Sequence, residues 1–176
     1  SSMHILNDLD LKPIIIPEMQ RSLNPYKDQI AFKKIQDIIK EFKPDIVHTH
    51  AAKAGALGRR AAYKLGVKQI YHTFHGHIFH SYFGSFKTRI FKKIERNLAK
   101  KTTKIIAISD IQKRELSKIH RICPEKKIEV IPLGFDLERF SSNKDFKRKE
   151  FRKKWNIKEN EIAIGIIGRL VPIKNH

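Results

Sequence analysis

The stretch DIVHTHAAKAGALGRRAA, residues 45–62, contains the pattern that decides the fold. It opens with a short apolar run that ends in histidines, and it continues as an alanine-rich segment with helical periodicity. Gly66 follows at a point where a helix commonly stops. A short apolar run followed by a helix is the repeating unit of a parallel sheet. We therefore predict a strand over 45–49 and a helix over 53–65.

The same alternation continues on both sides of this stretch. Asn24 and Pro25 form an N-cap and first-turn pair for a helix that ends at Lys43 and Pro44, and Ser109 caps a helix running to about residue 122. A further helix is predicted over 86–100, and strands are predicted over 12–17, 68–74, 104–108 and 127–132. This alternation predicts an α/β fold in which helices flank a parallel sheet.

The chain is strongly basic: 37 Lys and Arg against 18 Asp and Glu give a formal net charge of +19. Such an excess favours anionic partners, namely nucleic acid, acidic lipid or phosphorylated ligands. Much of it lies in the helix predicted over 86–100, opposite an expected buried row of Phe86, Ile90, Ile94 and Leu98. This charged face is either a solvated surface or a dock for an anionic membrane. The basic residues concerned are Lys87, Arg89, Lys92, Lys93, Arg96, Lys100 and Lys101.

No apolar run is long enough to span a membrane, and the N-terminus does not resemble a signal peptide. Cys123, the single cysteine, fits a reducing compartment. We therefore expect a soluble, cytoplasmic protein, with peripheral attachment to the inner membrane face as an option.

Polar and glycine residues gather where the predicted strands end, which is where parallel sheets bind ligands. His75 and His77, on either side of Gly76, are able to hydrogen-bond a polar ligand or an oxyanion. The other candidates for lining a cleft are His50, Ser109 and Gly134. A loop histidine without a catalytic task is the alternative for both His75 and His77.

Four histidines lie close together in the sequence, at positions 72, 75, 77 and 80. Their spacing matches no common zinc site, and no cysteine pair or HExxH helix supports one. We predict no metal ligands and expect His72 to pack in the core.

The last residues, IGIIGRLVPIKNH (164–176), contain a candidate anion site. An apolar strand predicted over 162–167 ends at Gly168, and Arg169 and Lys174 follow. Arginine is able to clamp a diphosphate through two parallel hydrogen bonds, and lysine adds a point charge. A strand followed by a solvated basic loop is the alternative. The charged stretch 140–158 is predicted to be a linker that leads into a short helix.

Five motifs in this order resemble the family 4 glycosyltransferases of the GT-B fold, particularly the bacterial members that assemble polysaccharides. The motifs are DIVHTHAAKAGALGRRAA, YHTFHGH, KIIAISD, KKIEVIPLGFDLERF and IGIIGRLVPIKNH, and the likeness extends from Lys12 to His176. The resemblance implies two Rossmann-like domains across a cleft, here residues 1–140 and the start of a second domain in 141–176. The first would bind the acceptor and the second the sugar nucleotide.

The resemblance also implies an activity and roles for residues. The enzyme would transfer a sugar from a nucleotide-diphosphate donor to a glycan or polyprenyl-linked acceptor, with retention of configuration and without a metal or other cofactor. His75 matches the family's active-site histidine, and Arg169 and Lys174 match the pair that neutralises the donor diphosphate. Polysaccharide or capsule assembly at the cytoplasmic membrane face is the expected setting.

Two family features have no counterpart here: a first strand with its glycine-rich loop, and the paired glutamates of the second domain. We therefore expect an internal piece of a longer enzyme, with little activity by itself. A nucleic-acid-binding module is one alternative, motivated by the aromatic residues among lysines in 146–155, although no binding motif supports it. The other alternative is a GT-B-shaped nucleotide-sugar epimerase.

Overall fold

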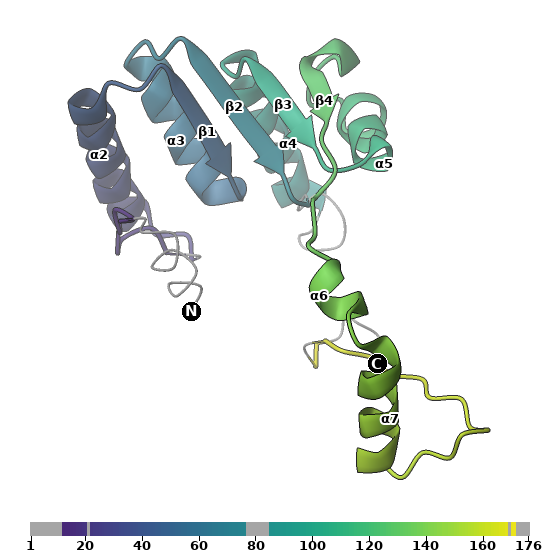
Figure 1. The fold of residues 1–176 in the computed structure, drawn as a ribbon. Helices are drawn as coiled ribbons and strands as arrows, with labels where there is room; N and C mark the ends of the chain where they lie inside the picture. Colours follow the sequence, from purple (N-terminus) through teal and green to yellow (C-terminus); the bar gives the residue numbers. More distant parts are fainter. Residues whose placement is uncertain (1–11, 21, 77–84, 169, 172–176) are drawn as a thin grey trace. The chain divides into compact units, whose positions relative to one another are not determined.

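A computed structural model describes residues 12–20, 22–76, 85–168 and 170–171 (Figure 1). The chain divides into two compact units, Ser1–Leu133 and Gly134–His176. This division lies earlier in the chain than the boundary at residue 140 that we predict from the sequence.

The first unit contains a parallel sheet of β1 (Ile46–His50), β2 (Gln69–Phe74), β3 (Lys104–Ala107) and β4 (Ile128–Val130). The spatial order β1-β2-β3-β4 follows the chain, and every neighbouring pair is parallel. The α/β fold and four of the predicted strands are thereby confirmed. In the register of β1 and β2, His50 lies opposite Thr73.

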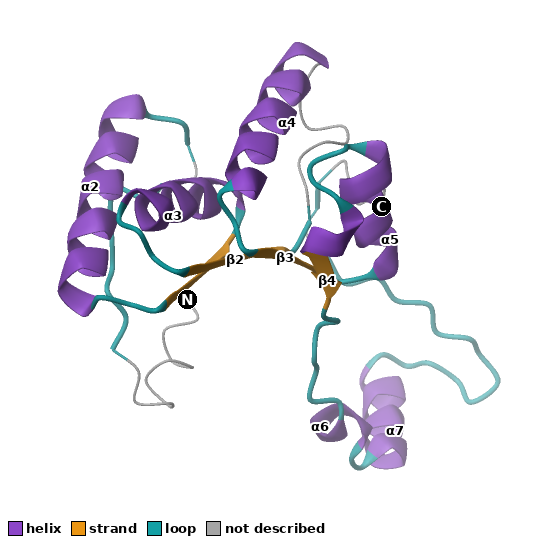
Figure 2. Cartoon of the chain, turned by 90° about the horizontal axis from the view of Figure 1, so that it is seen from above, coloured by secondary structure: helices purple, strands orange, loops and turns teal. Residues whose placement is uncertain are grey.

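The helices of this unit are α2 (Pro25–Phe42), α3 (Ala52–Lys64), α4 (Ser85–Lys100) and α5 (Asp110–Arg114). A π-helical segment, η1 (Glu115–Ile119), continues α5, and a 3-10 turn, η2 (Glu125–Lys127), precedes β4. Seen from above in Figure 2, α3, α4 and α5 lie on the same side of the sheet. Right-handed connections between strands that follow one another in space produce this arrangement.

Local signals set the ends of α2 as the sequence predicts. The Asn24 side chain accepts a hydrogen bond from the Lys27 N–H at 3.1 Å, and Pro25 occupies the first turn. At the other end Lys43 adopts the left-handed conformation, with φ of 50°, and its N–H bonds to the Ile39 carbonyl. The helix therefore stops just before Pro44.

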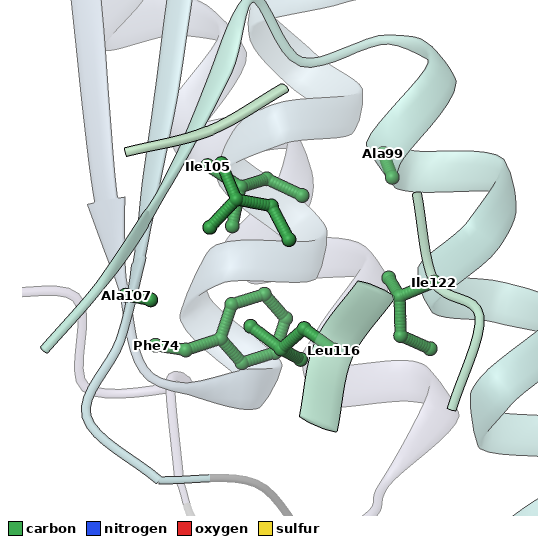
Figure 3. Packing of buried hydrophobic residues seen from close by; sticks show 7 residues of the cluster. Phe74, Ala99, Ile105, Ala107, Leu116 and Ile122 are labelled. Carbon is green, nitrogen blue, oxygen red and sulfur yellow. The ribbon is translucent and has the colours of Figure 1, made fainter. Parts of the chain in front are cut away.

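Two hydrophobic clusters fix the helices to the sheet. One joins β2, β3 and β4 to α4 and η1, and Figure 3 shows Phe74, Ile105 and Leu116 packed together in it. The other joins α2 and α3 to the sheet through Phe32, Ile39, Ala61, Ala62 and Ile70. Burial of these side chains is the main source of stability of such a layered unit.

The glycines of α3 allow this helix to pack closely on the sheet. A Cβ on Gly55 would lie 2.4 Å from Cε1 of His72, and a Cβ on Gly58 would lie 2.9 Å from Cγ2 of Thr49. The His72 ring is buried, as predicted, and its Nδ1 lies 2.9 Å from Oγ1 of Thr49. Burial, reinforced by the positive charge of Arg59, lowers the pKa of His72 to about 3. His72 is therefore a neutral core residue.

Gly55→Ala is expected to destabilise the protein by about 2–3 kcal/mol, because the added methyl group forces the His72 ring out of its place. Glycine-to-alanine changes inside helices normally stabilise by up to about 1 kcal/mol, so the sign of the effect is diagnostic. Chemical denaturation of Gly55→Ala, His72→Ala and the double variant measures the coupling between the two sites. Additive losses in the double variant would contradict this account.

Two of the predicted strands do not form. Residues 12–16 are irregular, and a turn follows at residues 17–18. Pro13 and Pro17 have no N–H to donate to a strand ladder, and Ile14 and Ile15 are exposed. In the second unit, residues 162–167 form no strand, and the described part of that unit contains no other strand to receive their hydrogen bonds.

The prediction for the face of α4 is also wrong. Leu98 is buried, but the exposed fractions of Phe86, Ile90 and Ile94 are 74%, 43% and 44%. The buried residues of α4 include Glu95, Leu98 and Ala99, and Glu95 pairs with the buried Arg59 of α3. The inward face thus combines this ion pair with apolar packing, and Phe86, Ile90 and Ile94 lie outside it.

Other boundaries change less. The helix predicted from Ser109 to about residue 122 ends at Ile119, and Arg121 adopts φ of 50°. A short helix does form in the second unit, but it lies inside the stretch 140–158 predicted as a linker: α7 (Lys144–Lys154) follows the single turn of α6 (Glu138–Ser141).

Candidate active site

His50 and His75 lie together at the carboxyl edge of the parallel sheet. His50 is the last residue of β1, and His75 directly follows β2. Nδ1 of His50 and Nε2 of His75 are 2.9 Å apart, and the rings stack with centroids 5.1 Å apart. One imidazole therefore donates a hydrogen bond to the other.

His48 extends this group along β1. Residues two apart on a strand point to the same face, so His48 and His50 lie on one side while Thr49 faces the helices. The ring centroids of His48 and His50 are 4.4 Å apart, and Nε2 of His48 lies 2.8 Å from Oγ1 of Thr73. Thr73 belongs to β2, and His75 directly follows β2. Two side-chain hydrogen bonds, His48–Thr73 and His50–His75, therefore connect β1 with this neighbouring segment.

The surroundings of His50 favour its neutral form. Partial burial lowers the pKa of His50 below its usual 6.5, and the positive charges that His48 and His75 would carry lower it further. At neutral pH His50 is therefore available as a neutral hydrogen-bonding partner of His75. His75 itself is exposed and faces solvent at the edge where a ligand would bind.

Of the other sequence candidates, Ser109, Gly76 and Gly134 lie within the described residues. Ser109 caps α5, since its hydroxyl accepts a hydrogen bond from the Gln112 N–H at 3.2 Å. Gly76 is exposed next to His75, and Gly134 is the first residue of the second unit. His77, Arg169 and Lys174 lie outside the described residues.

Sequence reasoning did not select His48 and Thr73 as members of the site. The H-x-H spacing of His48 and His50 was a usable signal, because alternation places both rings on one face of a strand. Thr73 carries no such signal, since its contact with His48 depends on the pairing of β1 with β2.

Within the described ranges, no group of three or more His, Cys, Asp or Glu side chains has the arrangement of a metal site. The histidine rings bond to one another and to threonine hydroxyls instead. At this edge of the sheet, the exposed imidazole of His75 is available to hydrogen-bond a ligand, and the imidazole of His50 contacts it.

A parallel α/β unit with a polar group at the carboxyl ends of its strands has the general plan of a nucleotide- or sugar-binding domain. The sequence model of Glycosyltransferase Family 4 matches residues 8–139, and the chain belongs to this family.

One relative is the UDP-Gal:alpha-D-GlcNAc-diphosphoundecaprenol alpha-1,3-galactosyltransferase of Escherichia coli. It is 36% identical over 171 residues, which is 96% of this chain and 43% of the relative. The chain thus spans less than half the length of this relative.

Two solved structures share the fold. The UDP-GlcNAc 2-epimerase from Methanocaldococcus jannaschii has a TM-score of 0.52 at 17% identity, covering 74% of this chain and 34% of that one. The UDP-GlcNAc 2-epimerase from Neisseria meningitidis, solved with bound UDP-GlcNAc, has a TM-score of 0.53 at 14% identity, covering 90% and 43%. At these identities the likeness concerns the fold alone.

Proposed function

We propose that this chain is part of a glycosyltransferase that transfers a hexose from a nucleotide-diphosphate sugar to a lipid-linked glycan acceptor in polysaccharide assembly. The observation that carries the proposal is the 36% identity across 96% of the chain to a galactosyltransferase, within a matched transferase family. The name of that relative specifies a UDP-galactose donor and a diphosphoundecaprenol-linked GlcNAc acceptor.

In the proposed reaction the bond between the sugar C1 and the donor diphosphate breaks. A bond from C1 to an acceptor hydroxyl oxygen forms, and the hydroxyl proton leaves with the products. Negative charge grows on the departing nucleoside diphosphate, so fixed cations near it lower the barrier. Arg169 and Lys174 are proposed for that task in the nucleotide-sugar domain, which would begin in the second unit. Retention of configuration and independence from metal are parts of the proposal.

His75 is proposed to hydrogen-bond the sugar that is being transferred. Its exposed ring at the strand edge is available to a ligand, and the ring nitrogen that faces His50 is already engaged. The hydrogen bond to His50 keeps the His75 ring in one orientation, and a contact to the transition state requires such a fixed orientation. His50 acts through His75 and is therefore a positioning residue.

The test is a transfer assay with the intact protein that contains this chain. It is incubated with UDP-galactose and a diphosphoundecaprenol-linked GlcNAc, with and without EDTA. Formation of a glycosidic bond with the anomeric configuration of the donor, unaffected by EDTA, is the expected result. Epimerised free UDP-sugar without a glycoside would instead identify the enzyme as an epimerase, and the absence of any sugar chemistry would overturn both assignments.

The exposed face of α4 supports peripheral attachment to an anionic membrane. Phe86, Ile90 and Ile94 form an outward apolar row, and Arg89 and Lys93 are exposed beside it. An interfacial helix combines these two features, since apolar side chains enter the headgroup region while cations bind acidic lipid. No helix in the described part of the chain is long and apolar enough to cross a membrane. The proposed location is the cytoplasmic face of the inner membrane.

Binding of the intact protein to phosphatidylglycerol vesicles is expected to fall about 30-fold in the variant Arg89→Gln/Lys93→Gln. Each cation near an anionic surface contributes about 1 kcal/mol at low salt. Lys33→Gln/Lys64→Gln removes the same charge from α2 and α3 and is the matched control in vesicle sedimentation. Equal losses in both variants would mean that the attraction comes from net charge and not from α4.

A further inference from the structure

A cationic pocket lies at the sheet edge opposite His50 and His75. It has a volume of 440 Å³ and is formed by the last turns of α4 and the segment that leads into β4. Lys100 precedes β3 and Lys127 directly precedes β4, so the pocket is at the amino ends of these strands. This volume lies within the range of about 300–1,000 Å³ that is typical of small-molecule sites.

Four cations line this pocket: Arg96, Lys100, Arg121 and Lys127. No carboxylate is among the lining residues. Three glutamates near these cations along the chain are engaged elsewhere: Glu95 pairs with Arg59 at 2.8 Å, Glu125 pairs with Lys118 at 2.7 Å, and Glu129 pairs with Lys104. Four positive charges around one pocket repel each other, and an anion would relieve that repulsion.

Arg96 is held in place before any ligand arrives. Its Nε donates to the Arg121 carbonyl and its Nη2 donates to the His120 carbonyl, each at 2.9 Å. Both acceptors are neutral, so these bonds fix the guanidinium and leave its charge unbalanced. A fixed guanidinium loses less freedom when it binds an anion than a free one does.

Arg121 occupies a position where glycine is the favoured residue. Its φ is 50°, and it follows the last helical turn, where the Ile122 N–H bonds to the Leu116 carbonyl. A residue in the left-handed conformation after a helix is most often glycine, because a Cβ is strained there. The Arg121 side chain also lines the pocket, so its charge adds to those of Arg96, Lys100 and Lys127.

Part of the pocket wall is apolar. Ala99 and Ile122 are buried, and Cys123 and Pro124 add further apolar surface. A ligand that fits both parts of the wall has an anionic group attached to a less polar body. We propose that this pocket binds the phosphate group of an organic phosphate, carried either by a free phosphate ester or by a phospholipid. The proposal does not depend on the transferase activity.

Cys123 provides a local readout because it lines the pocket and is the single cysteine in this sequence. Burial raises the pKa of its thiol, so alkylation is measured at alkaline pH. The rate of maleimide labelling of Cys123 is followed by peptide mass spectrometry in the full chain. The two probes are glycerol 3-phosphate and vesicles of phosphatidylglycerol, each compared with glycerol or phosphatidylcholine at equal ionic strength.

Slower labelling with either anionic probe and not with its neutral counterpart is expected, and the effective probe identifies the source of the phosphate. Lys127→Gln should weaken this protection about tenfold, the loss expected for one charge-assisted contact. Arg121→Gly should weaken it similarly while raising the melting temperature by about 3 °C. Lys33→Gln/Lys64→Gln should change neither. Absence of protection by both probes, or equal protection in all variants, would overturn the proposal.

Discussion

Replacing His75 with Ala in the intact protein is expected to lower kcat of the proposed sugar transfer by about 100-fold to 1,000-fold. That is the usual effect of removing one fixed donor from a transition state. KM for the sugar nucleotide should change much less, because the donor diphosphate is held by other groups in the proposed site. The measurement is initial-rate kinetics over a range of donor concentrations at saturating acceptor.

The fold should survive this substitution, because the His75 side chain is exposed and fills no part of the core. Melting temperature and circular dichroism therefore serve as controls for His75→Ala. A protein that no longer folds would give His75 a structural role, and one that transfers sugar at the normal rate would remove it from the active site.

Replacing His50 should lower kcat less than replacing His75, because His50 acts through His75. His50→Ala removes the ring that orients His75 at 2.9 Å, so kcat should fall by about tenfold. The pKa of His50 is lowered, so its neutral form persists to a pH below 6.5. This form is lost only as the pH falls below the pKa of His50 in the folded protein. Protonation ends its ability to accept a hydrogen bond. Activity should therefore decline at acid pH in the wild type, and that part of the decline should be absent from His50→Asn.

The sheet was predictable because its signal is local. The strands β1, β2 and β3 are short apolar runs between helical segments, and their ends differ from the predicted ones by only a residue or so. Residues 12–17 and 162–167 have a similar composition but remain unpaired. A strand needs a neighbouring strand to pair with its N–H and C=O groups. The sequence of one segment does not show whether that neighbour is present.

The candidate site was predictable to the same extent. A histidine at the end of a parallel strand must lie at the carboxyl edge, so His50 and His75 were found from chain order alone. Their hydrogen bond depends on the register that places His50 opposite Thr73. The cationic pocket had no local motif, because its four cations are spread from Arg96 to Lys127. The orientation of α4 was missed because Glu95 on its inward face pairs with Arg59, 36 residues away, and the local pattern does not show this partner.

Arg59→Met is expected to destabilise the protein by about 3–5 kcal/mol, the usual cost of leaving a buried charge without its partner. The Arg59 side chain is fully buried, and its Nη2 donates to both carboxylate oxygens of Glu95, at 3.0 and 2.8 Å. Its Nε donates to the Gly55 carbonyl at 3.0 Å. Arg60→Met is the matched control. Arg60 is exposed and lies over the Phe32 ring, so its loss should cost below about 1 kcal/mol.

The pH dependence of the Arg59→Met defect identifies Glu95 as its cause. Burial already raises the pKa of Glu95 above 4.5, and removal of the opposing Arg59 charge raises it further. The folded variant then holds this proton more tightly than the unfolded chain, so stability is lost as the pH rises above about 4.5. Denaturation at a series of pH values should show the gap to wild type widening from acid to neutral pH. The double variant Arg59→Met/Glu95→Leu should recover most of the loss, because two apolar side chains replace the pair without leaving a charge. A gap that is constant with pH and persists in the double variant would assign the defect to lost packing instead.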